Sequence, residues 1–219
     1  MDINYQDWFS TVESYYLLRK YHLPLQFGFY SFLLLMEHNQ TTAIVLDKTV
    51  LVLSSWAKVV LLAISIVASF AVPFLLGHPQ ILVGILVNAF LVLGALHMKK
   101  YSLLPLIMLP SLGVLARWVI FWPFTMFLVY MIPLIRIGNF LLVWGMKYFY
   151  LVKSWNRFLA LGVSAFIKFW LLFAVARVLV SLGFLPKIFL TTMWLLQLGT
   201  ALAGGVLAIG ITSVAGLRK

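Results

Sequence analysis

The sequence predicts an all-α membrane protein that crosses the bilayer several times. Of its 219 residues, 64% are hydrophobic and 10% are charged, and the mean hydropathy is +1.08. This composition lies far from that of soluble domains. Several runs also reach the roughly 17–25 apolar residues that a helix needs to cross a bilayer. We therefore expect a six-helix transmembrane bundle over residues 51–219 and a separate N-terminal segment over residues 1–50.

The N-terminal segment has the composition of chain that lies on a membrane surface. Residues 1–27 mix aromatic and polar positions, which is typical of an amphipathic helix at the interface. Residues 28–36 are apolar but too short to cross the hydrocarbon core. Residues 36–49 contain several polar and charged side chains, which predict an exposed connection. We expect residues 1–50 to be an interfacial segment.

Six apolar runs, separated by basic turns and by glycine or proline breaks, predict the spans. They cover residues 56–76, 80–97, 101–116, 136–152, 158–184 and 188–215. Cytoplasmic ends of membrane helices collect lysine and arginine. With both termini in the cytoplasm, these spans place eleven of the sixteen basic residues inside and three outside. The prediction is a multi-pass protein of the cell membrane, and it fits the charges better than a seventh span over residues 118–134.

The stretch between the third and fourth spans, residues 110–139, is apolar but interrupted by proline. The prolines are Pro110, Pro123 and Pro133. Two arginines, Arg117 and Arg136, flank an aromatic block that contains Trp118 and Trp122. Irregular backbone at membrane depth is tolerated only where it is buried in protein or lines a cavity. We expect this stretch to cover a binding site near the outer face.

The charges favour an anionic ligand. All five carboxylates precede residue 48, whereas fourteen lysines and arginines follow from Lys48 onward. Cation pathways and carboxylate proton relays need Asp or Glu within the membrane, so these functions are disfavoured. The net charge of +11 reflects cytoplasmic helix ends rather than nucleic-acid binding, because no basic face interleaved with exposed aromatics is present.

No pattern of catalytic or metal-binding residues occurs. The chain has no cysteine, which excludes disulfides and thiolate metal sites, and its four histidines form no i, i+4 pair. No nucleophile–base pair and no glycine-rich phosphate loop is present. We expect no catalytic residue, metal or cofactor, and no enzymatic activity.

Charged and amide side chains within the spans complete the candidate site. Lys168 lies about ten residues into the fifth span, where an unpaired charge is costly. Either an anionic ligand pairs with it, or backbone carbonyls, Asn88 or Asn139 satisfy it. The expected substrate-binding set is Arg117, Arg136, Asn139, Trp118, Trp122, Asn88, Gln197 and Lys168.

Small residues predict close helix packing. The last span carries Gly204, Ala208 and Thr212 at intervals of four, and the first span carries Ser65 and Ser69 at the same interval. This spacing lets a partner helix approach closely. The partner belongs either to the same bundle or to another subunit.

Four stretches resemble the substrate-binding S-components of energy-coupling factor (ECF) transporters. They are GHPQILVGILVNAFL (77–91), LPSLGVLARWVIFWPFTMFLVYMIPLIRIGNFLLV (109–143), GVSAFIKFWLLF (162–173) and WLLQLGTALAGGVLA (194–208). Some similar proteins carry the label "iron hydrogenase", but the absence of cysteine makes that chemistry implausible here. The resemblance covers residues 56–216. It implies six helices that bind a vitamin or similar small molecule near the outer surface, with a transmembrane T-component and cytoplasmic ATPases as partners.

We therefore expect a substrate-capture subunit for a small anionic or polar-aromatic solute, in contact with membrane lipid and not with nucleic acid. Two alternatives remain. A structural subunit of a larger membrane complex would explain the small-residue stripe and the lack of acid–base groups. A lipid-handling protein would use the basic residues to hold a phosphate headgroup.

Overall fold

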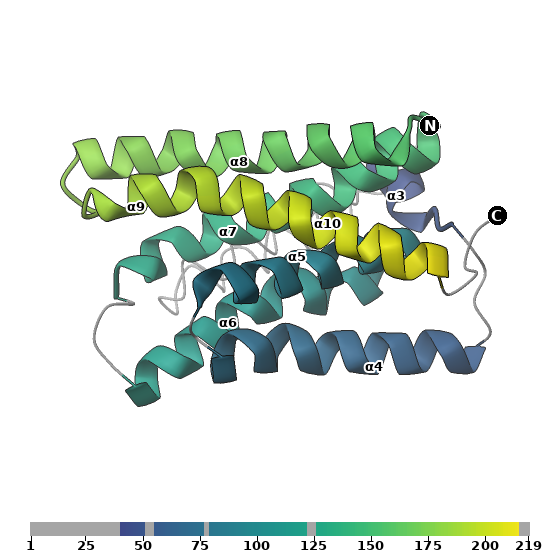
Figure 1. Cartoon of the computed structure of the whole chain (residues 1–219), viewed down its shortest axis with the longest axis horizontal. Helices are drawn as coiled ribbons and strands as arrows, with labels where there is room; N and C mark the ends of the chain where they lie inside the picture. Colours follow the sequence, from purple (N-terminus) through teal and green to yellow (C-terminus); the bar gives the residue numbers. More distant parts are fainter. Residues whose placement is uncertain (1–39, 51–54, 77–78, 122–125, 215–219) are drawn as a thin grey trace, which may run out of the picture.

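A computed structural model describes residues 40–50, 55–76, 79–121 and 126–214, and this part of the chain is all helical (Figure 1). The long helices are α4 (Ser55–Ala71), α5 (Gln80–His97), α6 (Leu104–Phe121), α7 (Met126–Gly145), α8 (Arg157–Ser181) and α10 (Gln197–Val214). The short elements are α3 (Gln40–Asp47), η1 (Val72–Leu76), η2 (Lys100–Leu103), η3 (Met146–Val152), α9 (Ile188–Thr191) and η4 (Thr192–Leu196). The expected all-α fold is confirmed.

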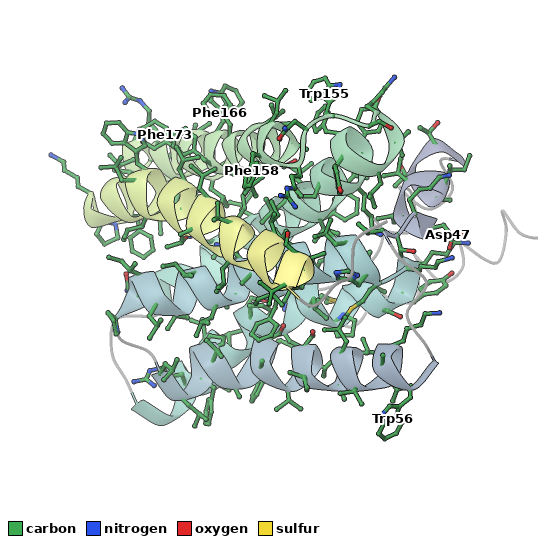
Figure 2. All side chains as sticks on the ribbon, turned by 45° about the vertical axis from the view of Figure 1, so that its right-hand side comes forward. Asp47, Trp56, Trp155, Phe158, Phe166 and Phe173 are labelled. Atoms are coloured by element: carbon green, nitrogen blue, oxygen red, sulfur yellow. The ribbon has the colours of Figure 1, made fainter. Side chains whose placement is uncertain are left out.

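Four helical segments are long and apolar enough to cross a membrane. They are Trp56–Leu76, Gln80–His97, Arg157–Ser181 and Trp194–Val214. Large apolar side chains cover their outer surfaces. Trp56 on α4 is 76% exposed, and Figure 2 shows it pointing away from the bundle, while Phe166 on α8 also faces outward. In a membrane this surface faces lipid, so the expectation of a membrane protein agrees with the structure at this level. The helices α6 and α7 lie outside this set of four.

The long helices lie roughly side by side, with α8 and α4 on opposite sides of the bundle (Figure 1). The short helix α3 lies at one end, which we call the α3 end; α4 and α8 begin there, and α5 and α10 finish there. The tightest pairing joins α5 and α10. A Cβ atom on Gly204 would meet the backbone of Ile85 and Ala89, and one on Gly84 would lie 2.8 Å from a methyl carbon of Thr200. Glycine at these positions lets the two helices approach this closely.

The expectation that proline breaks the chain within residues 110–139 is wrong for the described part of this stretch, residues 110–121 and 126–139. Pro110 lies inside α6 and Pro133 lies inside α7, and α7 begins at Met126, ten residues before the predicted fourth span. Neighbouring helices and polar side chains satisfy the backbone groups that proline leaves unpaired in membrane helices. Near Pro110, the Oγ of Ser111 donates to the carbonyl of Met108 at 2.7 Å. Pro123 lies outside the described residues.

The exposed connection expected over residues 36–49 is also corrected where the structure describes it. Residues 40–47 form α3, and the side chains of Thr42 and Val45 are buried against the bundle. Just beyond it, the backbone N–H of Val50 donates to the carbonyl of Leu96 at 2.8 Å. Burial of its apolar side chains therefore packs this partly polar segment against the end of the bundle. The interfacial helix expected over residues 1–27 lies outside the described residues.

Candidate functional site

Lys168 is a basic side chain buried in the interior of the helix bundle. It lies near the middle of α8 and is 2% exposed. Its ammonium donates to the Oδ1 of Asn88 on α5 at 2.6 Å and to the Oδ1 of Asn139 on α7 at 2.9 Å. Three helices therefore meet at one amino group. Both acceptors are neutral amides, so the positive charge is hydrogen-bonded without being neutralised.

The two asparagines extend these hydrogen bonds to further helices. The Nδ2 of Asn88 donates to the carbonyl of Gly84 at 2.8 Å and to the Oγ1 of Thr200 on α10 at 3.3 Å. The Nδ2 of Asn139 donates to the carbonyl of Ile107 on α6 at 3.3 Å. We call Lys168, Asn88, Asn139 and Thr200 the polar centre. It connects α5, α7, α8 and α10 directly and reaches α6 through a backbone carbonyl.

A second buried cation lies one helical turn from the polar centre. Arg136 precedes Asn139 by three residues on α7 and is 2% exposed. Its Nε donates to the Oγ of Ser111 on α6 at 2.8 Å. Ser111 follows Ile107 by one turn, so the contacts Arg136–Ser111 and Asn139–Ile107 lie on successive turns of the same helix pair. The bundle interior thus carries two buried basic side chains, Lys168 on α8 and Arg136 on α7.

No carboxylate in the described part of the chain reaches these cations. No residue after Asp47 has an acidic side chain. The Oδ2 of Asp47 itself lies 3.7 Å from the Nζ of Lys99 and forms an ion pair with it. That ion pair lies at the α3 end, and both side chains are about half exposed. The polar centre and Arg136 together form a positively charged interior built from amides, hydroxyls and backbone carbonyls.

Arg117 and Arg136, expected to bind one anion together, have different surroundings. Arg117 lies near the far end of α6, where its guanidinium donates to the carbonyls of Phe74 at 2.8 Å and Leu75 at 3.1 Å. These carbonyls belong to η1, so Arg117 caps the end of the first membrane helix. Arg136 lies deep in the bundle instead. The structure gives these two arginines no shared partner among the contacts it describes.

The other expected site residues also do not all come together. Asn88, Asn139 and Lys168 come together, whereas Gln197 is half-buried one turn before Thr200 on α10. The side chains of Trp118 and Trp122 lie outside the described part of the structure. Sequence reasoning missed Ser111 as a partner of Arg136 and Thr200 as a partner of Asn88. The signal for Ser111 is its position directly after Pro110, where a hydroxyl can replace lost helical hydrogen bonding.

The small residues expected to receive a partner helix lie inside this bundle. Gly204, Ala208 and Thr212 are buried on α10, and Ser65 and Ser69 are buried on α4. A Cβ on Gly204 would lie 2.9 Å from the Cβ of Asn88, so the stripe also positions the polar centre. The structure therefore places these residues at contacts within the chain.

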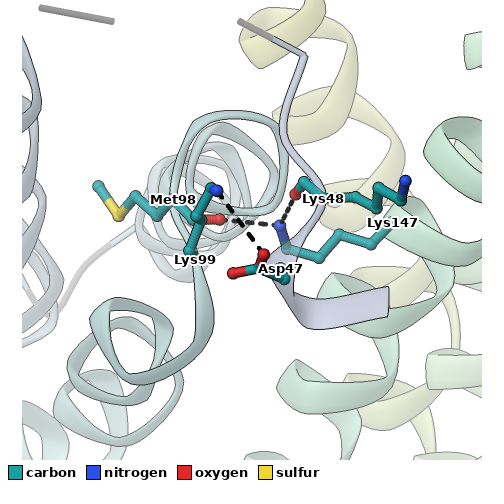
Figure 3. Close-up of polar contacts among 5 residues, drawn as sticks. All are labelled: Asp47, Lys48, Met98, Lys99 and Lys147. Carbon is teal, nitrogen blue, oxygen red and sulfur yellow. Dashed lines mark hydrogen bonds and ion pairs between the residues drawn. The ribbon is translucent and has the colours of Figure 1, made fainter. Parts of the chain in front are cut away.

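A second buried lysine holds the α3 end together. The ammonium of Lys147, fully buried in η3, donates to the carbonyl of Met98 at 2.8 Å and to the carbonyl of Lys48 (Figure 3). These carbonyls directly follow α5 and α3, where the negative ends of the helix dipoles favour a cation. Figure 3 also shows the Asp47–Lys99 pair beside this contact. Lys147 therefore has a structural partner set separate from the polar centre.

No family model, curated protein or solved structure matches this chain.

Proposed function

We propose that this protein is a membrane-embedded binding subunit that captures a small anionic solute inside its helix bundle. The observation that carries the proposal is the pair of buried cations, Lys168 and Arg136, in a bundle interior to which the described residues contribute no carboxylate. A charge near the centre of a membrane helix costs at least about 2.5–3.5 kcal/mol on insertion scales. Such residues usually mark a substrate or ion path.

A bound anion would supply the negative charge that the neutral partners of these cations lack. Asn88 and Asn139 accept hydrogen bonds from Lys168 but leave its charge uncompensated. An ammonium has three N–H donors, and two of them are used in these contacts. The Arg136 guanidinium contributes one N–H to Ser111 and has further donors in a planar fork suited to carboxylate or phosphate. A carboxylate or phosphate ligand matches both cations.

The distribution of charge supports a six-helix topology in which α6 and α7 also cross the cell membrane. The α3 end carries Lys48, Lys58, Lys99, Lys100, Lys147, Lys153 and Arg157, whereas the opposite end carries Arg117, Arg177 and Lys187. Basic residues favour the cytoplasmic side. We therefore place the α3 end and both termini in the cytoplasm, and the solute enters from the opposite end.

This arrangement fits the resemblance to the S-components of ECF transporters. Such a subunit would capture a vitamin or a similar small molecule and pass it on together with a T-component and ATPase subunits. Gln197, in the first turn of α10, would then contribute to the entrance rather than to the charged centre. The protein would have no catalytic role and would require no cofactor.

A structural subunit of a larger membrane complex is the second candidate. The observation that favours it is the internal pairing of Lys168, because two amide oxygens already accept hydrogen bonds from its ammonium. In that case the polar centre fixes the register of four helices, as buried polar groups do in some helical assemblies. Copurified ATPases support the binding subunit, and a stoichiometric assembly without ATPases supports the structural one.

Calorimetric titration of the purified protein in lipid nanodiscs tests the binding function. The probes are four carboxylate vitamins (biotin, pantothenate, nicotinate and folate), with nicotinamide as the neutral counterpart of nicotinate. We expect one of the anions to bind and Lys168→Gln or Arg136→Gln to weaken it at least about tenfold, the effect of losing one charged hydrogen bond. Arg177→Gln, an exposed change on α8, is the matched control. Equal affinity in all four proteins contradicts the assigned site.

A further inference from the structure

A small cavity opens at the α3 end, separate from the polar centre. Its volume is about 290 Å³, and it lies between the first half of α4, the end of α5 and η2. Five polar or charged residues form part of its wall: Thr49, Lys58, His97, Lys99 and Ser102. Two cations and two hydroxyls around one cavity form a set of donors suited to an anion.

His97 is the one imidazole in this wall. Its side chain is buried, and its Nδ1 has no hydrogen-bond partner among the described residues. Its Nε2 lies 3.1 Å from the Oγ1 of Thr212, whose hydroxyl donates to the carbonyl of Ala208 at 2.9 Å. Because the Thr212 hydroxyl hydrogen is used there, Nε2 carries the proton that completes the His97–Thr212 contact. With the proton on Nε2, the Nδ1 of the neutral imidazole is an acceptor.

The charge balance of the cavity is positive. Lys58 and Lys99 both line it, and one acidic residue of the described chain, Asp47, lies close at 3.7 Å from Lys99. That ion pair is about half exposed on each side, so it is weak and open to competition. The ammonium of Lys147 lies nearby but is occupied by two backbone carbonyls. The cavity therefore attracts anions more strongly than it repels them.

The position of the cavity indicates the source of the anion. The apolar span that starts at Trp56 has Lys58 in its first turn, and the span of α5 finishes at His97. Both ends mark the boundary between the hydrocarbon core and the headgroup region. Leu61 and Leu62, one turn deeper on α4, provide an apolar wall beneath the basic one. A phosphate bearing an apolar tail would match both walls.

We propose that this cavity is a binding site for a phosphate group at the membrane interface, held by Lys58 and Lys99 with His97 at the rear wall. An anionic phospholipid headgroup has this chemistry, and so does a soluble phosphate ester. The site is independent of the solute site at Lys168, since it uses different helix ends and different cations.

Native mass spectrometry of the full-length protein in detergent tests the proposal. The probes are phosphatidylglycerol and phosphatidylcholine with the same acyl chains, and calorimetry with glycerol 3-phosphate covers the soluble source. The variant Lys58→Gln/Lys99→Gln removes two cavity charges, and Lys100→Gln/Lys153→Gln removes two charges at the same end outside the cavity. We expect phosphatidylglycerol to bind more tightly than phosphatidylcholine, with a loss of roughly fivefold for each cavity lysine removed.

The outcomes separate specific binding from general attraction. A selective loss in the Lys58/Lys99 variant, with the control variant unchanged, supports the site. If glycerol 3-phosphate shows the same dependence, the phosphate site accepts soluble esters; if phosphatidylglycerol alone shows it, the ligand is a lipid. Equal losses in both double variants overturn the proposal, because they indicate attraction to the whole basic surface. Unchanged affinity in the cavity variant overturns it as well.

Discussion

The Nζ of Lys168 and the Oδ1 of Asn88 lie 2.6 Å apart, although 80 residues separate them in the chain. This hydrogen bond joins α8 to α5, and the bond from Lys168 to Asn139 adds α7. The ammonium is therefore a common point of three helices. Its charge is solvated by amides, which makes the same group a structural contact and the strongest candidate for holding an anion.

We expect the side chains of Lys168 and Asn139 to be energetically coupled through their hydrogen bond. We expect Asn139→Leu and Lys168→Met to lower thermal stability in detergent separately, because each leaves a buried polar partner unsatisfied. The double variant should lose less free energy of unfolding than the sum of the two single losses. We expect a coupling energy of about 1 kcal/mol, which is in the range for interhelical hydrogen bonds in membranes. A double-mutant cycle from thermal unfolding measures this. Strict additivity would contradict the described geometry.

Gly204 is required for the approach of α10 to α5. A methyl group at this position would lie 2.8 Å from the backbone nitrogen of Ala89, which has no freedom to move aside. We expect Gly204→Ala to destabilise the protein by about 1–3 kcal/mol, the usual cost of overpacking. Thermal unfolding in detergent checks this value.

The matched control is Gly210→Ala on the same helix. Apart from the backbone of α10 itself, no heavy atom of the described residues lies within 4 Å of a Cβ built there, so the higher helix propensity of alanine should leave stability unchanged or slightly increased. Equal destabilisation at both positions would show that close packing of α5 and α10 is not what Gly204 provides.

The sequence alone was enough to predict the helical class and several elements closely. The expected spans 56–76 and 80–97 coincide with the first two candidate membrane segments, because uninterrupted apolar runs specify helices in lipid. It also offered Asn88 and Asn139 as partners for Lys168, and both hydrogen bonds are present. Scarce polar residues in an apolar bundle have few possible partners, which makes such pairings foreseeable.

The same reasoning failed where partners depend on helix rotation and depth. Pro110 and Pro133 suggested breaks in the helices, yet α6 and α7 continue past them. Side chains and neighbouring helices can satisfy the backbone groups that proline leaves unpaired. Arg117 and Arg136 suggested one site because they flank one segment. The first instead caps η1, and the second turns into the bundle toward Ser111. Sequence spacing specifies neither which face of a helix is buried nor which backbone carbonyl is exposed beside it.

Arg117 is expected to contribute to local order rather than to solute affinity. Arg117→Gln removes the donors that reach the Phe74 and Leu75 carbonyls. Residues 72–76 should then exchange their backbone hydrogens faster, while the affinity for a captured anion stays within about twofold of wild type, since the guanidinium of Arg117 holds the carbonyls at the end of η1. Hydrogen–deuterium exchange and calorimetry check the two parts. A tenfold loss of affinity would place Arg117 in the site after all.

Lys147 is expected to hold α3 on the bundle. Its ammonium bridges the carbonyls of Met98 and Lys48, so Lys147→Met leaves two carbonyls at helix ends without their cation while keeping the side-chain volume. We expect residues 40–50 to exchange backbone hydrogens at least about tenfold faster, because each lost hydrogen bond to a charged group is worth roughly 1.5–3 kcal/mol. The control is Lys153→Met at the same end, whose ammonium lies over the ring of Tyr148. Because Val45 and Val50 remain buried, α3 should loosen without unfolding the long helices. If the backbone hydrogens of residues 40–50 exchange at the same rate in both variants, apolar burial alone holds α3 on the bundle. The hydrogen bonds of Lys147 are then dispensable.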